Sequence, residues 1–122
     1  MLRIVQIIDT LEAGGAERMA VNYANALAAT VSFSGLVATR SEGLLKSKLN
    51  EGVHYLYLNK KHPIDVVAVA KLYRYCKKNN ANILHAHSSS YFMAFLIKCL
   101  LPKIKIIWHD HYGLSEKLSE RK

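Results

Sequence analysis

Four of the six histidines fall in two short segments: His85 and His87 flank one residue, and His109 and His111 flank Asp110. Imidazole and carboxylate groups are ordinary ligands of zinc and iron, so one interpretation is a metal-dependent hydrolase. Histidine also forms hydrogen bonds near neutral pH, so a second interpretation is a polar cleft that binds a sugar or a phosphate. Neither segment contains a cysteine, and no further carboxylate cluster completes a hydrolase site. We therefore favour the polar cleft and expect no bound metal and no cofactor.

The second candidate is a glycine pair, Gly14 and Gly15, within a polar loop over residues 9–18. A glycine pair that opens a helix lets the backbone approach a ligand closely, and the free N–H groups of a helix N-terminus suit a phosphate. The loop lacks both the Gly-x-Gly-x-x-Gly dinucleotide pattern and the Gly-Lys-Ser/Thr of a P-loop. A tight strand-to-helix turn without a ligand remains an equal alternative.

Three serines follow His87 directly. They are expected to cap the next helix or to bind a polar ligand, and for Ser89 we prefer the cap. If the preceding strand bends at Ala86, one of His85 and His87 faces the cleft while the other packs against a helix.

The elements that must position these residues alternate along the chain. Short apolar runs rich in β-branched residues predict five strands, at residues 2–8, 31–39, 53–58, 81–86 and 103–108. Helical spacing of apolar residues predicts four helices, at residues 16–28, 42–50, 63–79 and 91–101. Pro63 is expected to open the third helix in its first turn. The predicted apolar face of the first helix comprises Met19, Ala20, Tyr23, Ala24 and Leu27.

Strands that alternate with helices predict an α/β fold, a Rossmann-like doubly wound parallel sheet of about five strands with helices on both faces. The expected strand order is 3-2-1-4-5. Ligands of such sheets bind beyond the carboxyl ends of the strands, at the switch point of the topology. The residues to inspect therefore follow strands 1, 4 and 5, where the glycine pair and the histidines lie.

Composition narrows the class of protein. The 122 residues are 51% hydrophobic and carry 17 basic and 9 acidic side chains, a net charge of +8, which is typical of one globular domain. The basic residues are scattered and no nucleic-acid-binding motif is present, so we expect no nucleic acid partner. The two cysteines are unclustered, which favours a cytoplasmic protein. The longest apolar stretch, residues 91–101, is too short to span a bilayer.

The segment Ile4 to Asp9, followed by Gly14-Gly15-Ala16-Glu17-Arg18, resembles the opening of family-four glycosyltransferases of the GT-B fold. The pairing of His85-Ala86-His87 with Trp108-His109-Asp110-His111 is similar to the same family, in the same order along the chain. The resemblance covers nearly all of the chain.

This resemblance implies retaining transfer of a sugar from a nucleotide-sugar donor to a glycan or lipid-linked acceptor, in polysaccharide or cell-envelope biosynthesis, without a metal. It implies that Gly14 and Gly15 lie against the donor diphosphate and that His109 contacts the donor sugar near the reacting carbon. The implied acceptor or sugar contacts are His87, Ser88, Asp110, His111 and Tyr112. Helix N-termini and basic side chains would stabilise the leaving diphosphate electrostatically.

Residues 1–122 match only the N-terminal, acceptor-side domain of that family, and nothing matches its C-terminal, donor-binding domain. We therefore expect a fragment that has no appreciable transferase activity alone and whose missing partner is the C-terminal domain. The alternatives are a metal-dependent hydrolase that uses His85, His87, His109 and His111, and a non-catalytic flavodoxin-like binding module.

Peripheral contact with the inner face of the membrane is a further hypothesis. It rests on Tyr91, Phe92 and Phe95, with Lys98, Lys103 and Lys105 nearby. The alternative is that the apolar helix at 91–101 is buried by the sheet and by the missing part of the protein.

Overall fold

A computed structural model describes residues 1–62 and 64–109. Five strands form one sheet: β1 (Arg3–Thr10), β2 (Phe33–Ser41), β3 (His54–Tyr57), β4 (Ile83–His87) and β5 (Lys105–His109). The helices are α1 (Gly15–Ala28), α2 (Val66–Lys78) and α3 (Tyr91–Leu100), with short 3-10 turns η1 (Leu44–Lys48) and η2 (Ser88–Ser90). Each predicted strand is present, with ends within about two residues of those expected.

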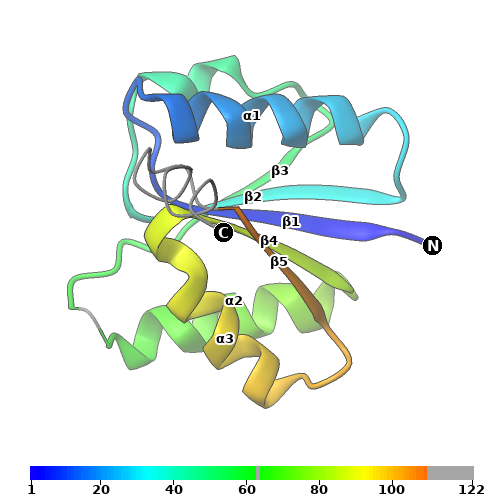
Figure 1. Cartoon of the computed structure of the whole chain (residues 1–122), viewed down its shortest axis with the longest axis vertical. Coiled ribbons are helices and arrows are strands. Elements are labelled where there is room, and N and C mark those ends of the chain that lie inside the picture. The colour runs from blue at the N-terminus through cyan, green and yellow to red at the C-terminus, as the bar shows by residue number, and fades with distance from the viewer. Residues whose placement is uncertain (63, 110–122) are drawn as a thin grey trace, which may run out of the picture.

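The sheet has the order β3-β2-β1-β4-β5, and all four strand pairs are parallel. α1 covers one face, and α2 and α3 cover the other (Figure 1). The predicted order and the Rossmann-like α/β class are confirmed. The carboxyl ends of β1 and β4, between which the topology reverses, lie side by side, as the register of Ile7 with Ala86 shows.

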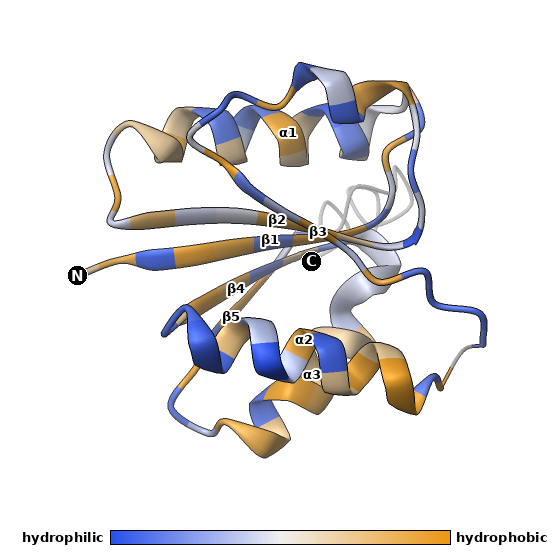
Figure 2. Cartoon of the chain, turned by 180° about the vertical axis from the view of Figure 1, so that it is seen from behind, coloured by the Kyte–Doolittle hydropathy of each residue, from blue (hydrophilic) through white to orange (hydrophobic). Residues whose placement is uncertain are grey.

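Two hydrophobic clusters hold the layers together. One joins β1 and β4 to α2 and α3 through Val5, Leu72, Leu84 and Ile97. The other joins β1 and β2 to α1 and η1 and is smaller. Figure 2 shows that hydrophobic residues predominate along α3, whereas α1 and α2 alternate between polar and apolar residues. The central strand β1 is buried on both sides, as a strand between two helical layers must be.

Three local predictions are wrong. The expected helix at 42–50 is a five-residue 3-10 turn that buries only Leu45, because Leu44 points into solvent. The third helix begins at Val66, later than predicted, because the Asp65 side chain accepts the Ala68 N–H at 3.1 Å and so makes Asp65 the N-cap. Pro63 itself lies outside the described residues.

The apolar face of α1 is also rotated from the one predicted. The buried residues are Ala20, Val21 and Ala24, whereas Met19 and Tyr23 are 37% and 38% exposed. Tyr23 therefore lies at the margin of the helix–sheet interface, where it meets the histidines described below.

Among the described residues, none of the helices combines the length and the apolar character needed to cross a bilayer.

Candidate functional site

A cavity of about 340 Å³ opens at the carboxyl edge of the sheet, beside the N-terminus of α1. Its lining comes from the end of β1, the start of α1, the end of β2 and the β4–η2 junction: Ile8, Asp9, Thr10, Gly15, Ala16, Glu17, Arg40, His87, Ser88 and Ser89. The structure therefore brings together three of the residues predicted from sequence, Gly15, His87 and Ser88. Asp110, His111 and Tyr112 lie outside the described residues.

The two glycines differ in what surrounds them. Gly14 is the N-cap of α1 and has an extended backbone, and a Cβ there would lie 2.5 Å from Oε1 of Glu17. Glu17 is held in place by the Thr10 hydroxyl, which donates to its Oε2 at 3.0 Å. A Cβ on Gly15 would meet no atom within 4 Å, so the fold itself does not require glycine there. The missing side chain at Gly15 leaves space on the wall of the cavity.

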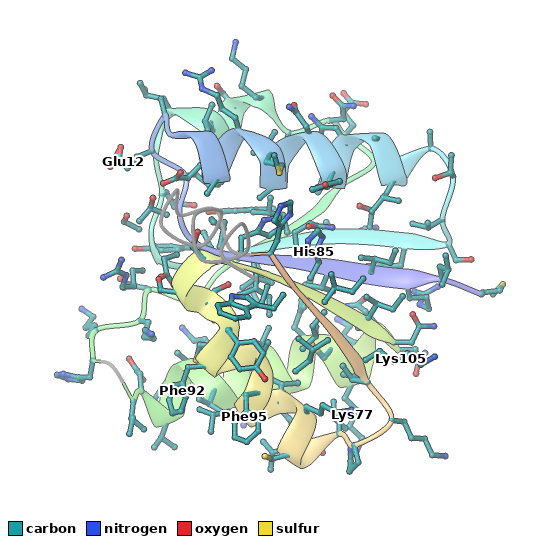
Figure 3. All side chains as sticks on the ribbon, viewed as in Figure 1. Glu12, Lys77, His85, Phe92, Phe95 and Lys105 are labelled. Carbon is teal, nitrogen blue, oxygen red and sulfur yellow. The ribbon has the colours of Figure 1, made fainter. Side chains whose placement is uncertain are left out.

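Three histidine rings converge beside this cavity. The ring centroids of His85 and His87 are 4.2 Å apart, and His109 lies 5.7 Å from His85 and 5.9 Å from His87. The Tyr23 ring of α1 is tilted against His85 at 5.0 Å. Figure 3 shows His85 between α1 and the sheet. The expectation that His85 and His87 face different ways is wrong, because β4 stays extended through His87 and residues two apart share a face.

His87 is fully buried, and both of its ring nitrogens are engaged. Nε2 lies 2.7 Å from Oε1 of Gln6, and the ring also accepts the backbone N–H of Ser90. A carbonyl oxygen can only accept, so Nε2 must donate to Gln6 and the other nitrogen, Nδ1, must accept from Ser90. This arrangement specifies the neutral Nε2–H tautomer of His87.

The histidines also form the one group of possible metal ligands found among the described residues. Ligand atoms of His85, His87 and His109 lie within 4.8 Å of one another. His111, the fourth member of the predicted cluster, lies outside the described residues. A metal bound through His87 would have to displace either Gln6 or the Ser90 N–H, and the first would leave the buried Gln6 carbonyl without its donor.

None of the three serine side chains caps α3, which was one of the two roles predicted for them. Ser90 Oγ accepts the His87 N–H at 2.9 Å and donates to main-chain carbonyl oxygens, so with His87 it caps the short turn η2. Ser89 does not cap α3, because its hydroxyl donates to Oδ2 of Asp9. Ser88 has φ 53, a left-handed backbone that few non-glycine residues adopt, and its carbonyl accepts from the Trp108 indole at 2.9 Å.

Sequence reasoning missed two residues that organise the edge, Asp9 and Arg40. Asp9 accepts the Thr39 hydroxyl at 2.6 Å and the Ser89 hydroxyl, which connects the ends of β1, β2 and β4. The Arg40 guanidinium lies 3.8 Å from the Asp9 carboxylate. Asp9 comes directly after the buried residues of β1, and this position in the sequence could have indicated a polar side chain at the carboxyl edge of the sheet. Arg40 lies at the carboxyl end of β2, and the strand ends singled out from the sequence did not include this one.

Comparison with known proteins supplies the family. The family model described as Glycosyltransferase Family 4 matches residues 13–122, which is most of the chain. No curated protein matches the chain significantly. The matched region contains the glycine pair, the histidine-bearing strand ends and the whole carboxyl-edge cavity except its β1 wall. The chain belongs to glycosyltransferase family 4.

Proposed function

We propose that the chain is the N-terminal, acceptor-side domain of a retaining glycosyltransferase whose C-terminal domain binds the donor. The enzyme would move a sugar from a nucleotide-sugar donor to a glycan or lipid-linked acceptor in polysaccharide or cell-envelope biosynthesis. The observation that carries the proposal is the family match together with a cavity at the edge where parallel α/β sheets bind ligands. Family membership favours this function over a non-catalytic flavodoxin-like module.

Gly14 and Gly15 are the proposed contacts of the donor diphosphate. Open space at Gly15 supports this role, because a backbone without a side chain allows a phosphate to approach the N–H groups at the start of α1. The carboxylate of Glu17 lines the same cavity and opposes an anion. We therefore expect basic side chains of the proposed C-terminal domain to supply most of the charge that stabilises the leaving diphosphate.

His109 is the proposed catalytic residue. It ends β5, is partly exposed, and stacks 5.7 Å from His85 with nearly parallel rings. From this place its imidazole would hydrogen-bond a donor-sugar hydroxyl near the reacting carbon, which orients the sugar without a covalent bond to the protein. Ser88 lines the cavity and stays a proposed acceptor contact, together with Asp110, His111 and Tyr112. His87 also lines the cavity, and any contact of its ring with the acceptor would be by packing, because both of its nitrogens are engaged within the protein.

Expression of the reading frame that contains this chain tests the proposal. We expect the product to convert a nucleotide sugar in the presence of an acceptor extract, and the His109→Ala variant to lose at least tenfold in rate. Stability of the variant, measured by thermal unfolding, is the control. An active product whose rate is unchanged by His109→Ala would contradict the assigned role.

A metal-dependent hydrolase is the second candidate, because the three clustered histidines have metal-ligand spacing. It predicts stoichiometric zinc or iron in the purified protein and hydrolysis that a chelator abolishes. The engaged nitrogens of His87 favour the transferase, for which we expect neither metal nor chelator sensitivity.

We propose that the protein is cytoplasmic and that it contacts the inner face of the membrane peripherally, where the reaction would take place. Phe92 and Phe95 are each 46% exposed on the outer side of α3 (Figure 3), which supports an apolar contact. The Lys98 ammonium keeps its charge but is held at the end of α3, because it donates to the Ile104 carbonyl at 2.6 Å. Sedimentation with anionic vesicles tests the contact: it should weaken in Phe92→Ser, and no binding at low salt would end the hypothesis.

A further inference from the structure

A second cavity adjoins the first at the carboxyl edge, on the side of β2 and β3. Its volume is about 310 Å³, at the lower end of the range of ligand pockets, which is about 300–1,000 Å³. The lining residues are Asp9, Arg40, Lys60, Lys61, His62 and Ser89. Asp9, Arg40 and Ser89 line both cavities, so a ligand in one lies beside a ligand in the other.

The two cavities differ in charge. The first contains the carboxylates of Asp9 and Glu17 and the single guanidinium of Arg40. The second contains Arg40, Lys60 and Lys61 against Asp9 alone, so cations exceed carboxylates by 3 − 1 = 2. An anion is therefore attracted more strongly to the second cavity than to the first.

The positive charge of the second cavity is not cancelled locally. Both oxygens of Asp9 already accept hydroxyl hydrogen bonds, and the Arg40 side chain is 57% exposed at 3.8 Å from it. Within residues 1–62 and 64–109, no carboxylate lies within 4.0 Å of the Lys60 or Lys61 ammonium. These groups are thus available to a ligand.

The backbone holds the two lysines at the cavity. Asn59, which follows β3 closely, has a left-handed conformation, φ 53. The Lys60 N–H then donates to the Thr39 carbonyl at 2.6 Å, and the Lys61 N–H donates to Oδ2 of Asp65 at 2.9 Å. The hydrogen bonds from the Lys61 and Ala68 backbones lower the pKa of Asp65, so this anchor stays ionised near neutral pH.

We propose that this second cavity, formed by Arg40, Lys60, Lys61, His62 and Ser89, binds a phosphate group carried by the acceptor substrate. Lysine and arginine side chains are common phosphate ligands, whereas the Ser89 hydroxyl already donates to Asp9 and only lines the wall of the cavity. The adjoining first cavity then receives the sugar-accepting part of the same molecule. Only the identification of the ligand as the acceptor rests on the proposed function; the phosphate site stands on the charges and the cavity.

Titration of the chain with inorganic pyrophosphate, followed by amide chemical shifts, tests the site. The variant Lys60→Gln with Lys61→Gln removes two charges from the cavity. The matched control is Lys77→Gln with Lys78→Gln, which removes two charges from the last turn of α2. Figure 3 shows Lys77 at the opposite end of the molecule from Glu12, which follows β1 at the carboxyl edge.

In the unaltered chain we expect shifts at Arg40, Asn59 to His62 and Ser89. Pyrophosphate affinity should fall at least tenfold in the cavity variant and less than twofold in the control. Equal losses in both variants, or no shifts at the cavity, would overturn the site. The unliganded spectrum of each variant establishes that it is folded.

Titration with uridine diphosphate separates this inference from the proposed function. Shifts confined to Gly14 and Gly15 that survive the cavity variant would support donor binding and overturn the phosphate site. Shifts at Lys60 and Lys61 alone would support the phosphate site and contradict the donor contacts.

Vesicles identify the source of the phosphate. If the acceptor phosphate is lipid-borne, phosphatidylcholine vesicles should bind the chain only when they contain phosphatidic acid, and pyrophosphate should displace it. Pyrophosphate binding without vesicle binding points to a water-soluble acceptor. Absence of both would overturn the site.

Discussion

Gly15→Ala should make the protein more stable and a poorer ligand binder at the same time. A Cβ at Gly15 meets nothing within 4 Å, and the residue has no positive φ, so alanine fits without strain. Replacing a glycine in a helix under these conditions adds about 0.4–1 kcal/mol to the free energy of unfolding. With an unfolding entropy of about 2.1 cal/mol/K per residue, the 122 residues give about 0.26 kcal/mol/K, and Tm should rise by roughly 2–4 °C.

The neighbouring glycines provide the comparison. Gly14→Ala must displace the Glu17 carboxylate and its hydrogen bond to Thr10, so no gain is expected. Gly43→Ala would place its Cβ 2.5 Å from the backbone nitrogen of Glu12, and backbone cannot move aside. Overpacking of this kind costs about 1–3 kcal/mol. The predicted order of stability is therefore Gly15→Ala, unaltered chain, Gly14→Ala, Gly43→Ala.

The same methyl group should interfere with the ligand. If the donor diphosphate lies against Gly15, overpacking by about 1–3 kcal/mol corresponds to a loss of roughly 5- to 150-fold in affinity for a nucleoside diphosphate. Urea unfolding and an amide-shift titration measure the two effects on one sample. A Gly15→Ala variant that is less stable than the unaltered chain would contradict the open space around a Cβ at Gly15. An unchanged affinity of this variant for the nucleoside diphosphate would contradict the diphosphate contact.

Two further predictions concern buried groups. His87→Leu should lower the free energy of unfolding by about 1–3 kcal/mol, because the buried Gln6 carbonyl loses its donor. The double variant Gln6→Leu with His87→Leu should cost less than the sum of the two single changes. Additive costs, measured by urea unfolding, would contradict the pairing of the two side chains. Burial raises the pKa of the Cys76 thiol to about 12. Iodoacetamide should therefore label the exposed Cys99 and spare Cys76 until the chain unfolds. Labelling of Cys76 in the native chain, detected by mass spectrometry, would contradict its burial. Since the unfolded Cys76 thiol ionises near pH 9 and the folded one does not, its contribution to stability should be complete below pH 9 and should decline as pH rises toward 12.

The sheet could be predicted because its signals are local. Each strand is a short apolar run bounded by polar residues, and the alternation with helices leaves few topologies. The prediction of a helix at 42–50 is wrong because the spacing of Leu44 and Leu45 in the sequence does not show that only Leu45 is buried. The start of α2 was predicted too early because the sequence pattern does not show that the Asp65 side chain accepts the Ala68 N–H and caps the helix there.

The site could be predicted only in part, because its organising contacts join residues far apart in sequence. The convergence of the histidines follows from neighbouring strand ends of a parallel sheet. By contrast, the hydrogen bond between His87 and Gln6 spans 81 residues, and that between Ser89 and Asp9 spans 80. From the sequence, Lys60 and Lys61 are expected only to be part of a polar loop. The structure places them beside Arg40 in the lining of one cavity.

We propose above that this chain forms one wall of a transferase site that a second domain completes. The most direct measurement is sugar transfer from a radiolabelled nucleotide sugar to an acceptor extract, by the 122-residue chain alone and by the product of its whole reading frame. We expect no turnover by the chain alone, and turnover that depends on His109 by the product that includes a second domain. Robust sugar transfer by the isolated chain would contradict it.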